Sequence, residues 1–159
     1  MGLVPLGLFA AYAAVAAERR TPAEALWMCH IANLLMAIGV FARSPRLVGI
    51  AFLWIVLGIP LWALDAWQRA EVPLVSFVSH LGGLAFGMYA VRRLPLSSNP
   101  WLAALAVFLV LQQVCRWWTP PASNINLSHV EWSFWLATSL AAAACLWGIG
   151  RLSTKGRKA

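Results

Sequence analysis

The chain has 159 residues, of which 62% are hydrophobic and 11% charged, with a mean hydropathy of +0.75 and a net charge of +7. A soluble domain carries about 25% charged residues and about 45–50% apolar ones, so the composition excludes an ordinary soluble domain. Lys and Arg fall in short gaps between apolar segments and at the C-terminus, where membrane topology and lipid headgroups account for them. We therefore expect an all-α polytopic membrane protein whose partners are membrane lipid and other membrane proteins, with no nucleic acid.

Six apolar segments follow one another along the chain, and each approaches the roughly 20 residues that cross a bilayer as a helix. They cover residues 2–17, 23–41, 47–64, 72–91, 101–118 and 131–150. Pro22 and Pro100 stand where helices tend to begin, whereas Pro60 lies near a segment end, where a kink would disturb little. The first segment lacks a basic region before it, so we interpret it as a retained helix rather than a signal peptide. The pattern predicts about six transmembrane helices in one bundle over 1–150, followed by a basic cytoplasmic tail over 151–159.

Charge asymmetry between the loops predicts the orientation. With six crossings both termini lie on one side, which collects eight basic residues: Arg43, Arg46, Arg92, Arg93, Arg151, Lys155, Arg157 and Lys158. The other side has four, namely Arg19, Arg20, Arg69 and Arg116. The positive-inside rule then places both termini in the cytoplasm. Many of the ten tryptophans, Trp62 among them, lie near segment ends, which is typical of an aromatic belt at the headgroup level.

Polar side chains within the apolar segments are the candidates for function, because hydrocarbon tolerates them only against a partner or a cavity. Cys29 lies about 10 Å into its segment and His80 about 12 Å into its own, both from the non-cytoplasmic side, at a rise of 1.5 Å per residue. This shared depth is what a thiol nucleophile and an imidazole base would need. Asn33 shares the helical face of Cys29 and could orient the base or bind an oxyanion, a role also open to Ser79.

The fourth segment has a second pattern, since Ser76, His80, Gly83 and Gly87 share one helical face. Small residues allow helices to approach closely, so this face should turn His80 toward a neighbouring helix rather than toward lipid. His30 projects about 100° away from Cys29, so we do not expect these adjacent residues to act together on one atom.

Simpler interpretations compete with the catalytic one. A buried cysteine often behaves as a small hydrophobic residue, and an intramembrane histidine is often a hydrogen-bond partner between helices. Cys29, Cys115 and Cys145 form no CxxC pair and predict no disulfide framework. A metal site would need His30, His80 and His129 to converge from different depths without HxxH spacing, so we expect no metal and no cofactor.

The segment ALWMCHIANLLMAIGVFARSPRLVGIAFLWIVLGIPLWALDA, with Ser79-His80 in SFVSHLGGLAFG and the later NINLSHVEW, resembles the YwaF-like bacterial membrane proteins. The resemblance covers roughly residues 23–148. That family is grouped with intramembrane lipid acyltransferases that use Cys and His, and more distantly with the androgen-induced-protein hydrolases. The resemblance implies Cys29 as nucleophile, His80 as base, and a bacterial cytoplasmic membrane. Trp27 stands where the family has a histidine, and Ile125 stands where it has a tyrosine.

These observations together predict a lipid acyl-ester acyltransferase or hydrolase with a Cys29–His80 site assisted by Asn33 and Ser79. Ser76, Gly83, Asn124, Asn126 and His129 are the candidate substrate-binding residues. Two alternatives are a non-catalytic accessory subunit of a larger membrane complex and a small-molecule transporter. Fixed partners on purification would favour the subunit, whereas labelling of Cys29 by an electrophilic lipid would favour the enzyme.

Overall fold

A computed structural model of the chain describes residues 1–68, 72–94, 96 and 99–155, and this part is entirely helical. The elements in chain order are α1 (Leu3–Glu18), η1 (Pro22–Leu26), α2 (Met28–Phe41), α3 (Pro45–Gln68), α4 (Leu74–Arg93), α5 (Pro100–Trp118), η2 (Pro121–Ser123), η3 (Ile125–Leu127) and α6 (Trp132–Lys155). The predicted all-α class is therefore confirmed.

Four of these helices, α3 to α6, are long and apolar enough to cross a membrane. The first two are also apolar but shorter, with 16 residues in α1 and 14 in α2. Membrane-spanning helices are thus supported for four of the six predicted segments, and six crossings stay a prediction.

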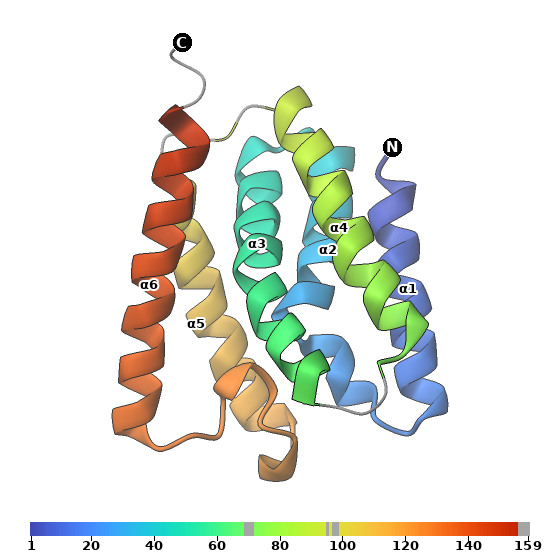
Figure 1. Ribbon diagram of the computed structural model, residues 1–159, viewed down its shortest axis with the longest axis vertical. Helices are drawn as coiled ribbons and strands as arrows, with labels where there is room; N and C mark the ends of the chain where they lie inside the picture. The colour runs from blue at the N-terminus through green and yellow to red at the C-terminus, as the bar shows by residue number, and fades with distance from the viewer. Residues whose placement is uncertain (69–71, 95, 97–98, 156–159) are drawn as a thin grey trace.

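The helices run alternately up and down, so the start of α1 and the end of α6 lie at the same end of the array (Figure 1). Helix α3 is central and packs against α2, α4, α5 and α6. Helix α1 covers α2 and α4 on one side, and α6 packs against α5 and α3 on the other. Four helices, α1 to α4, therefore surround the candidate polar side chains of α2 and α4.

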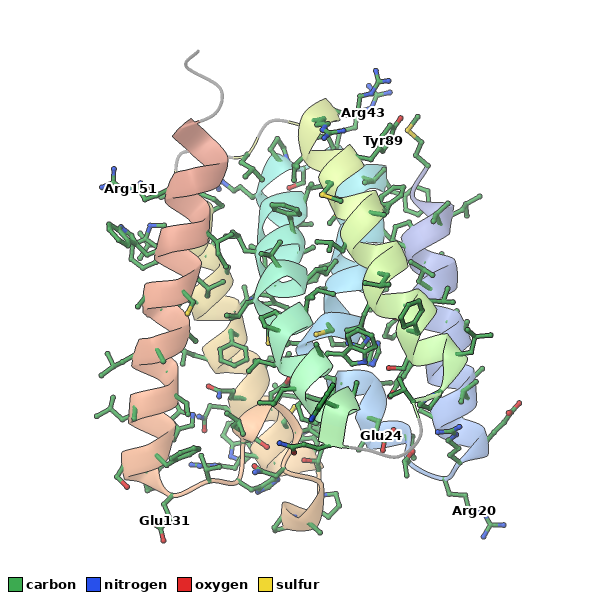
Figure 2. All side chains as sticks on the ribbon, in the orientation of Figure 1. Arg20, Glu24, Arg43, Tyr89, Glu131 and Arg151 are labelled. Atoms are coloured by element: carbon green, nitrogen blue, oxygen red, sulfur yellow. The ribbon has the colours of Figure 1, made fainter. Side chains whose placement is uncertain are left out.

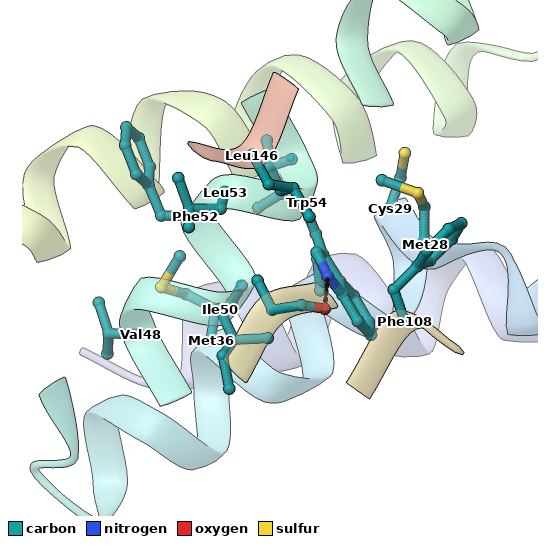
Figure 3. Close-up of a cluster of buried hydrophobic side chains, with 14 of the residues drawn as sticks. Met28, Cys29, Met36, Val48, Ile50, Phe52, Leu53, Trp54, Phe108 and Leu146 are labelled. Carbon is teal, nitrogen blue, oxygen red and sulfur yellow. Dashed lines mark hydrogen bonds between the residues drawn. The ribbon is translucent and has the colours of Figure 1, made fainter. Parts of the chain in front are cut away.

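The packed core lies around α3, which contributes most of its large side chains (Figure 3). Trp54 is fully buried, donates its indole N–H to the Ala104 carbonyl over 2.9 Å, and meets Phe108 edge-on with ring centroids 6.2 Å apart. Met28 and Cys29 lie at the margin of the same cluster. Burial of the polar indole is tolerated because its one donor is satisfied within the protein.

Several tryptophans agree with the expected belt. Trp67, Trp117, Trp118 and Trp132 are 89%, 77%, 80% and 65% exposed. They stand at the ends of α3 and α5 and the start of α6, which meet at one end of the array (Figure 1). Exposed indoles at a common level are what a headgroup region favours.

Two boundaries differ from the sequence prediction. The segment predicted over 23–41 is divided, because Trp27 has an extended backbone (φ −54°, ψ 136°) between η1 and α2. The segment predicted to end at 64 continues to Gln68, which places Pro60 inside α3 rather than near its end. Proline lacks an N–H, so the Val56 carbonyl four residues earlier has no helical donor. Both irregularities lie beside the candidate site.

Candidate functional site

A group of polar and aromatic side chains fills the space between α1, α2, α3 and α4, and we call it the histidine cluster. Its members are Tyr12 from α1, His30 and Asn33 from α2, Trp62 from α3, and Ser76, Ser79 and His80 from α4. All except Tyr12 and Trp62 are buried. The predicted face of Ser76, His80, Gly83 and Gly87 is buried as expected.

The His80 ring is fixed by stacking on Trp62 and by a hydrogen bond to the Ser76 carbonyl. Its ring stacks on Trp62 with centroids 4.6 Å apart and planes 15° from parallel, while the indole N–H of Trp62 is 3.1 Å from the Ser76 hydroxyl. His80 Nδ1 lies 2.8 Å from the Ser76 carbonyl oxygen. A carbonyl oxygen can only accept, so Nδ1 carries the proton of the neutral ring and Nε2 keeps its lone pair. The fold therefore presents His80 as a base through Nε2.

His30 is the imidazole that α2 places against His80. The two ring centroids are 5.2 Å apart in an edge-to-face arrangement, and Tyr12 stacks on the other face of His30 at 3.4 Å. His30 Nδ1 is 3.2 Å from the Ser79 hydroxyl. The sequence analysis considered His30 only with respect to Cys29, and it did not predict these contacts of His30 with His80 and Ser79.

Asn33 of α2 forms hydrogen bonds with α4. Its amide nitrogen is 3.2 Å from the Ser79 carbonyl, 3.1 Å from the Ser79 hydroxyl and 3.4 Å from the Cys29 carbonyl. The amide oxygen has no hydrogen-bond partner among the described residues and faces Gly83, where an added Cβ would lie 2.5 Å from it. Only glycine fits at 83, since this close approach of α2 to α4 leaves no room for a methyl group.

Cys29 packs against α3. Its sulfur lies on Gly58 so closely that a Cβ there would overlap it. Gly58 and Trp62 are four residues apart in α3, so they share a helical face on successive turns. Cys29 therefore lies on one turn of this face and the His80 ring stacks on the next. No hydrogen bond joins the Cys29 thiol to His80 in the part of the chain that the structure describes.

Cys29 is also the second residue of α2, in the first turn, where backbone N–H groups lack an intrahelical acceptor. The N–H of Met28 is taken by Asn126 Oδ1 at 2.8 Å. The next N–H, that of Cys29, has no acceptor among the described residues other than the sulfur of Cys29 itself. The positive end of the α2 dipole favours negative charge at this position, on sulfur or on a bound oxygen.

The remaining predicted residues lie around the α5–α6 connection. Asn124 Oδ1 accepts the backbone N–H of His129 over 3.0 Å, and the His129 ring is 3.2 Å from the Thr119 hydroxyl. Neither Asn124 nor His129 has a hydrogen bond to Cys29 or to His80. Asn126 differs, because its side chain reaches the start of α2. The described part of the chain brings no three His, Cys, Asp or Glu side chains together in an arrangement that could hold a metal ion.

Tyr12 and Trp62 are cluster members that the sequence did not indicate. Trp62 was assigned to the belt by its position near a segment end, yet it is half-buried and hydrogen-bonded to Ser76. Tyr12 lies in a segment without other polar groups, and its hydroxyl is 3.3 Å from the Glu24 carboxylate. Figure 2 shows Glu24 at the end of the array opposite Arg43 and Arg151. The sequence held one signal for Trp62, which is its spacing of four residues from Gly58. The structure shows that this glycine is buried.

Comparison of the chain with protein-family models, curated protein sequences and solved structures gives no match. Function is therefore inferred from the geometry of the cluster and from the chemistry of its residues.

Proposed function

We propose that the protein is an intramembrane lipid acyl-ester acyltransferase or hydrolase in which Cys29 is the nucleophile and His80 the base. The observation that carries this proposal is the shared face of α3, with Cys29 on Gly58 and His80 on Trp62 one turn away. The positive end of the α2 dipole lies beside Cys29, and the Ser76 carbonyl fixes the His80 tautomer that can accept a proton.

The depth of this face suits a lipid substrate. From exposed Trp67 to Gly58 there are nine residues of α3 (67 − 58), or about 13 Å along a helix axis at 1.5 Å per residue. Ester carbonyls of membrane lipids lie just below the headgroups, so the lipid must move inward by most of this distance to bring one to Cys29. A water-soluble ester would need a polar channel to the same point.

In the proposed reaction, His80 Nε2 accepts the thiol proton and the Cys29 thiolate attacks the carbonyl carbon of the ester. The negative charge moves to the carbonyl oxygen, where the backbone N–H of Cys29 can donate to it. Collapse of this intermediate breaks the carbon–oxygen bond to the leaving alcohol, which takes the proton from His80. The thioester on Cys29 is then attacked by an acceptor alcohol or by water.

Asn33 and Ser79 have positioning roles in this scheme. The donors of the Asn33 amide are engaged by Ser79 and by the Cys29 carbonyl, so the amide holds the start of α2 against α4. The N–H of Cys29, which has no acceptor among the described residues other than its own sulfur, is the better oxyanion donor.

The trapped intermediate tests this function. The protein in phospholipid vesicles is incubated with a phospholipid carrying a labelled acyl chain, quenched in acid, and digested for mass spectrometry. We expect the acyl mass on the Cys29 peptide and its loss in neutral hydroxylamine, which cleaves thioesters and spares oxygen esters. Cys145→Ala, which changes an exposed cysteine of α6, should leave the adduct intact. Absence of any adduct, together with a fixed partner on purification, would favour the accessory-subunit alternative.

A second candidate nucleophile is Ser79, because its hydroxyl lies 3.2 Å from His30 Nδ1 and 3.1 Å from the Asn33 amide. A hydroxyl hydrogen-bonded to an imidazole is the arrangement of a serine nucleophile with its base. An adduct on the Ser79 peptide that resists hydroxylamine would assign the reaction to this pair instead.

We further propose a bacterial cytoplasmic membrane with both termini in the cytoplasm, on the strength of the eight-to-four distribution of basic residues. Figure 2 shows Arg43 and Arg151 at the same end of the array, opposite Arg20. A reporter that is active only in the periplasm should stay silent when fused after residue 159, and it should be active when inserted after Arg20. The reverse pattern would invert the orientation and move the site to the cytoplasmic leaflet.

A further inference from the structure

The connection between α5 and α6 contains one asparagine with an unusual set of contacts. Asn126 has a left-handed backbone (φ 55°, ψ 28°) and is 3% exposed. Its side-chain oxygen accepts the backbone N–H of Met28 over 2.8 Å, and its side-chain nitrogen donates to the Leu26 carbonyl over 2.8 Å. These two contacts bracket Trp27, the residue at which η1 ends and α2 begins.

Asn126 lies 98 residues from Met28 in the sequence, and it supplies the capping acceptor that the residues around Trp27 lack. Trp27, at the N-cap of α2, makes no side-chain cap hydrogen bond. A helix that starts among apolar side chains needs an acceptor for its first N–H groups, and Asn126 is the acceptor for the first of them. The Leu26 carbonyl, left without a helical donor by the break, is satisfied by the same side chain.

The asparagine is itself held in place from α5. Gln112 donates from its side-chain nitrogen to the Asn126 carbonyl over 2.9 Å, and Asn126 Nδ2 is 3.5 Å from the Cys115 sulfur. Gln112 is 1% exposed and Cys115 is fully buried. A link of buried hydrogen bonds thus runs from α5 through the connection to the residue that precedes Cys29.

We propose that Asn126 is a positioning residue for Cys29, which sets the start of α2 and so holds the thiol on Gly58. This inference rests on the proposed function for its catalytic meaning, but the geometry can be tested separately. The sequence prediction made Asn126 a substrate-binding residue. Its carboxamide is instead engaged on both sides by protein groups, so its effect on a substrate is exerted through α2.

The test compares Asn126→Gly with Asn124→Gly. Glycine keeps the left-handed backbone at both positions, φ 55° at 126 and φ 36° at 124, so only the side chains are lost. The two side-chain hydrogen bonds to Met28 and Leu26 are lost, and since one such bond contributes about a factor of five, the first turn of α2 should open at least about fivefold more often. We expect a water-soluble maleimide to modify Cys29 faster by about that factor in Asn126→Gly, as measured by mass spectrometry of the Cys29 peptide. In Asn124→Gly the maleimide should modify Cys29 at the wild-type rate.

Turnover gives a second readout. In Asn126→Gly the kcat for the labelled phospholipid should fall by a similar factor while KM stays near the wild-type value. Asn126→Asp keeps an oxygen for the Met28 N–H but loses the donor to the Leu26 carbonyl, so both measurements should lie between those of the wild type and Asn126→Gly. Unchanged modification of Cys29 in Asn126→Gly would overturn the inference, as would equal effects of Asn124→Gly. If the wild type shows no turnover, the proposed function fails, and the maleimide comparison still decides whether Asn126 positions Cys29.

Discussion

Replacement of His80 by glutamine should lower kcat for the labelled phospholipid by about 10²–10⁴-fold, the usual contribution of a general base. Glutamine can keep a hydrogen bond to the Ser76 carbonyl, which His80 Nδ1 makes at 2.8 Å, but it cannot accept the thiol proton. Formation of the thioester on Cys29 should slow in parallel, because a neutral thiol is a weak nucleophile. Quench-flow measurement of the acyl adduct separates this step from later transfer.

The matched control is His30→Gln, which alters the other imidazole of the cluster. His30 contacts Ser79 and the edge of His80, so we expect a loss smaller than about tenfold, within what a lost hydrogen bond of about 1 kcal/mol produces. The opposite ranking, with His30→Gln and Ser79→Ala inactive and His80→Gln active, would reject Cys29–His80 and support Ser79–His30.

Gly58→Ala should inactivate and destabilise the protein together. The added methyl group would overlap the Cys29 sulfur, and an extra methyl in a packed core typically costs about 1–3 kcal/mol. Because α3 is central, we expect the sulfur to move instead of the helix, which takes Cys29 off the face that it shares with the His80 stack. Thermal unfolding in detergent and the rate of acyl-adduct formation measure the two effects.

Gly7→Ala and Gly148→Ala provide the comparison, because a Cβ at either position meets nothing within 4 Å. Alanine is favoured over glycine within a helix by up to about 1 kcal/mol, so both controls should be as stable as the wild type or more so. Equal behaviour of all three variants would show that the sulfur has room to move and that its contact with Gly58 is not required.

Features that depend on local periodicity could be predicted from the sequence. The buried face of α4 follows from the spacing of Ser76, His80, Gly83 and Gly87, because residues at i, i+4, i+7 and i+11 share one side of any α-helix. The membrane class follows from composition alone. The similar depth of Cys29 and His80 rests on a count of residues from each segment start, and it stays a prediction.

Features that depend on tertiary contact could not be predicted. Trp62 belongs to the cluster because α3 continues past Pro60 to Gln68, whereas a proline and a nearby aspartate indicate the end of a helix. Tyr12 has no polar neighbour in its own segment. The break at Trp27 is stabilised by Asn126, and a contact over 98 residues leaves no mark in the local pattern.

The lengths of the first two helices have a consequence for the surrounding lipid. Helix α1 has 16 residues and α2 has 14, which gives them lengths of about 24 Å and 21 Å, against a hydrocarbon thickness of about 30 Å. Leu3, Val4 and Leu6 on α1 are exposed, so in the proposed six-helix topology this side of the array faces the acyl chains. A bilayer around such short helices would relieve the hydrophobic mismatch by thinning. Thinning would lower the glycerol backbone of nearby phospholipids toward the midplane, and it would bring their ester groups closer to the level at which α2 begins.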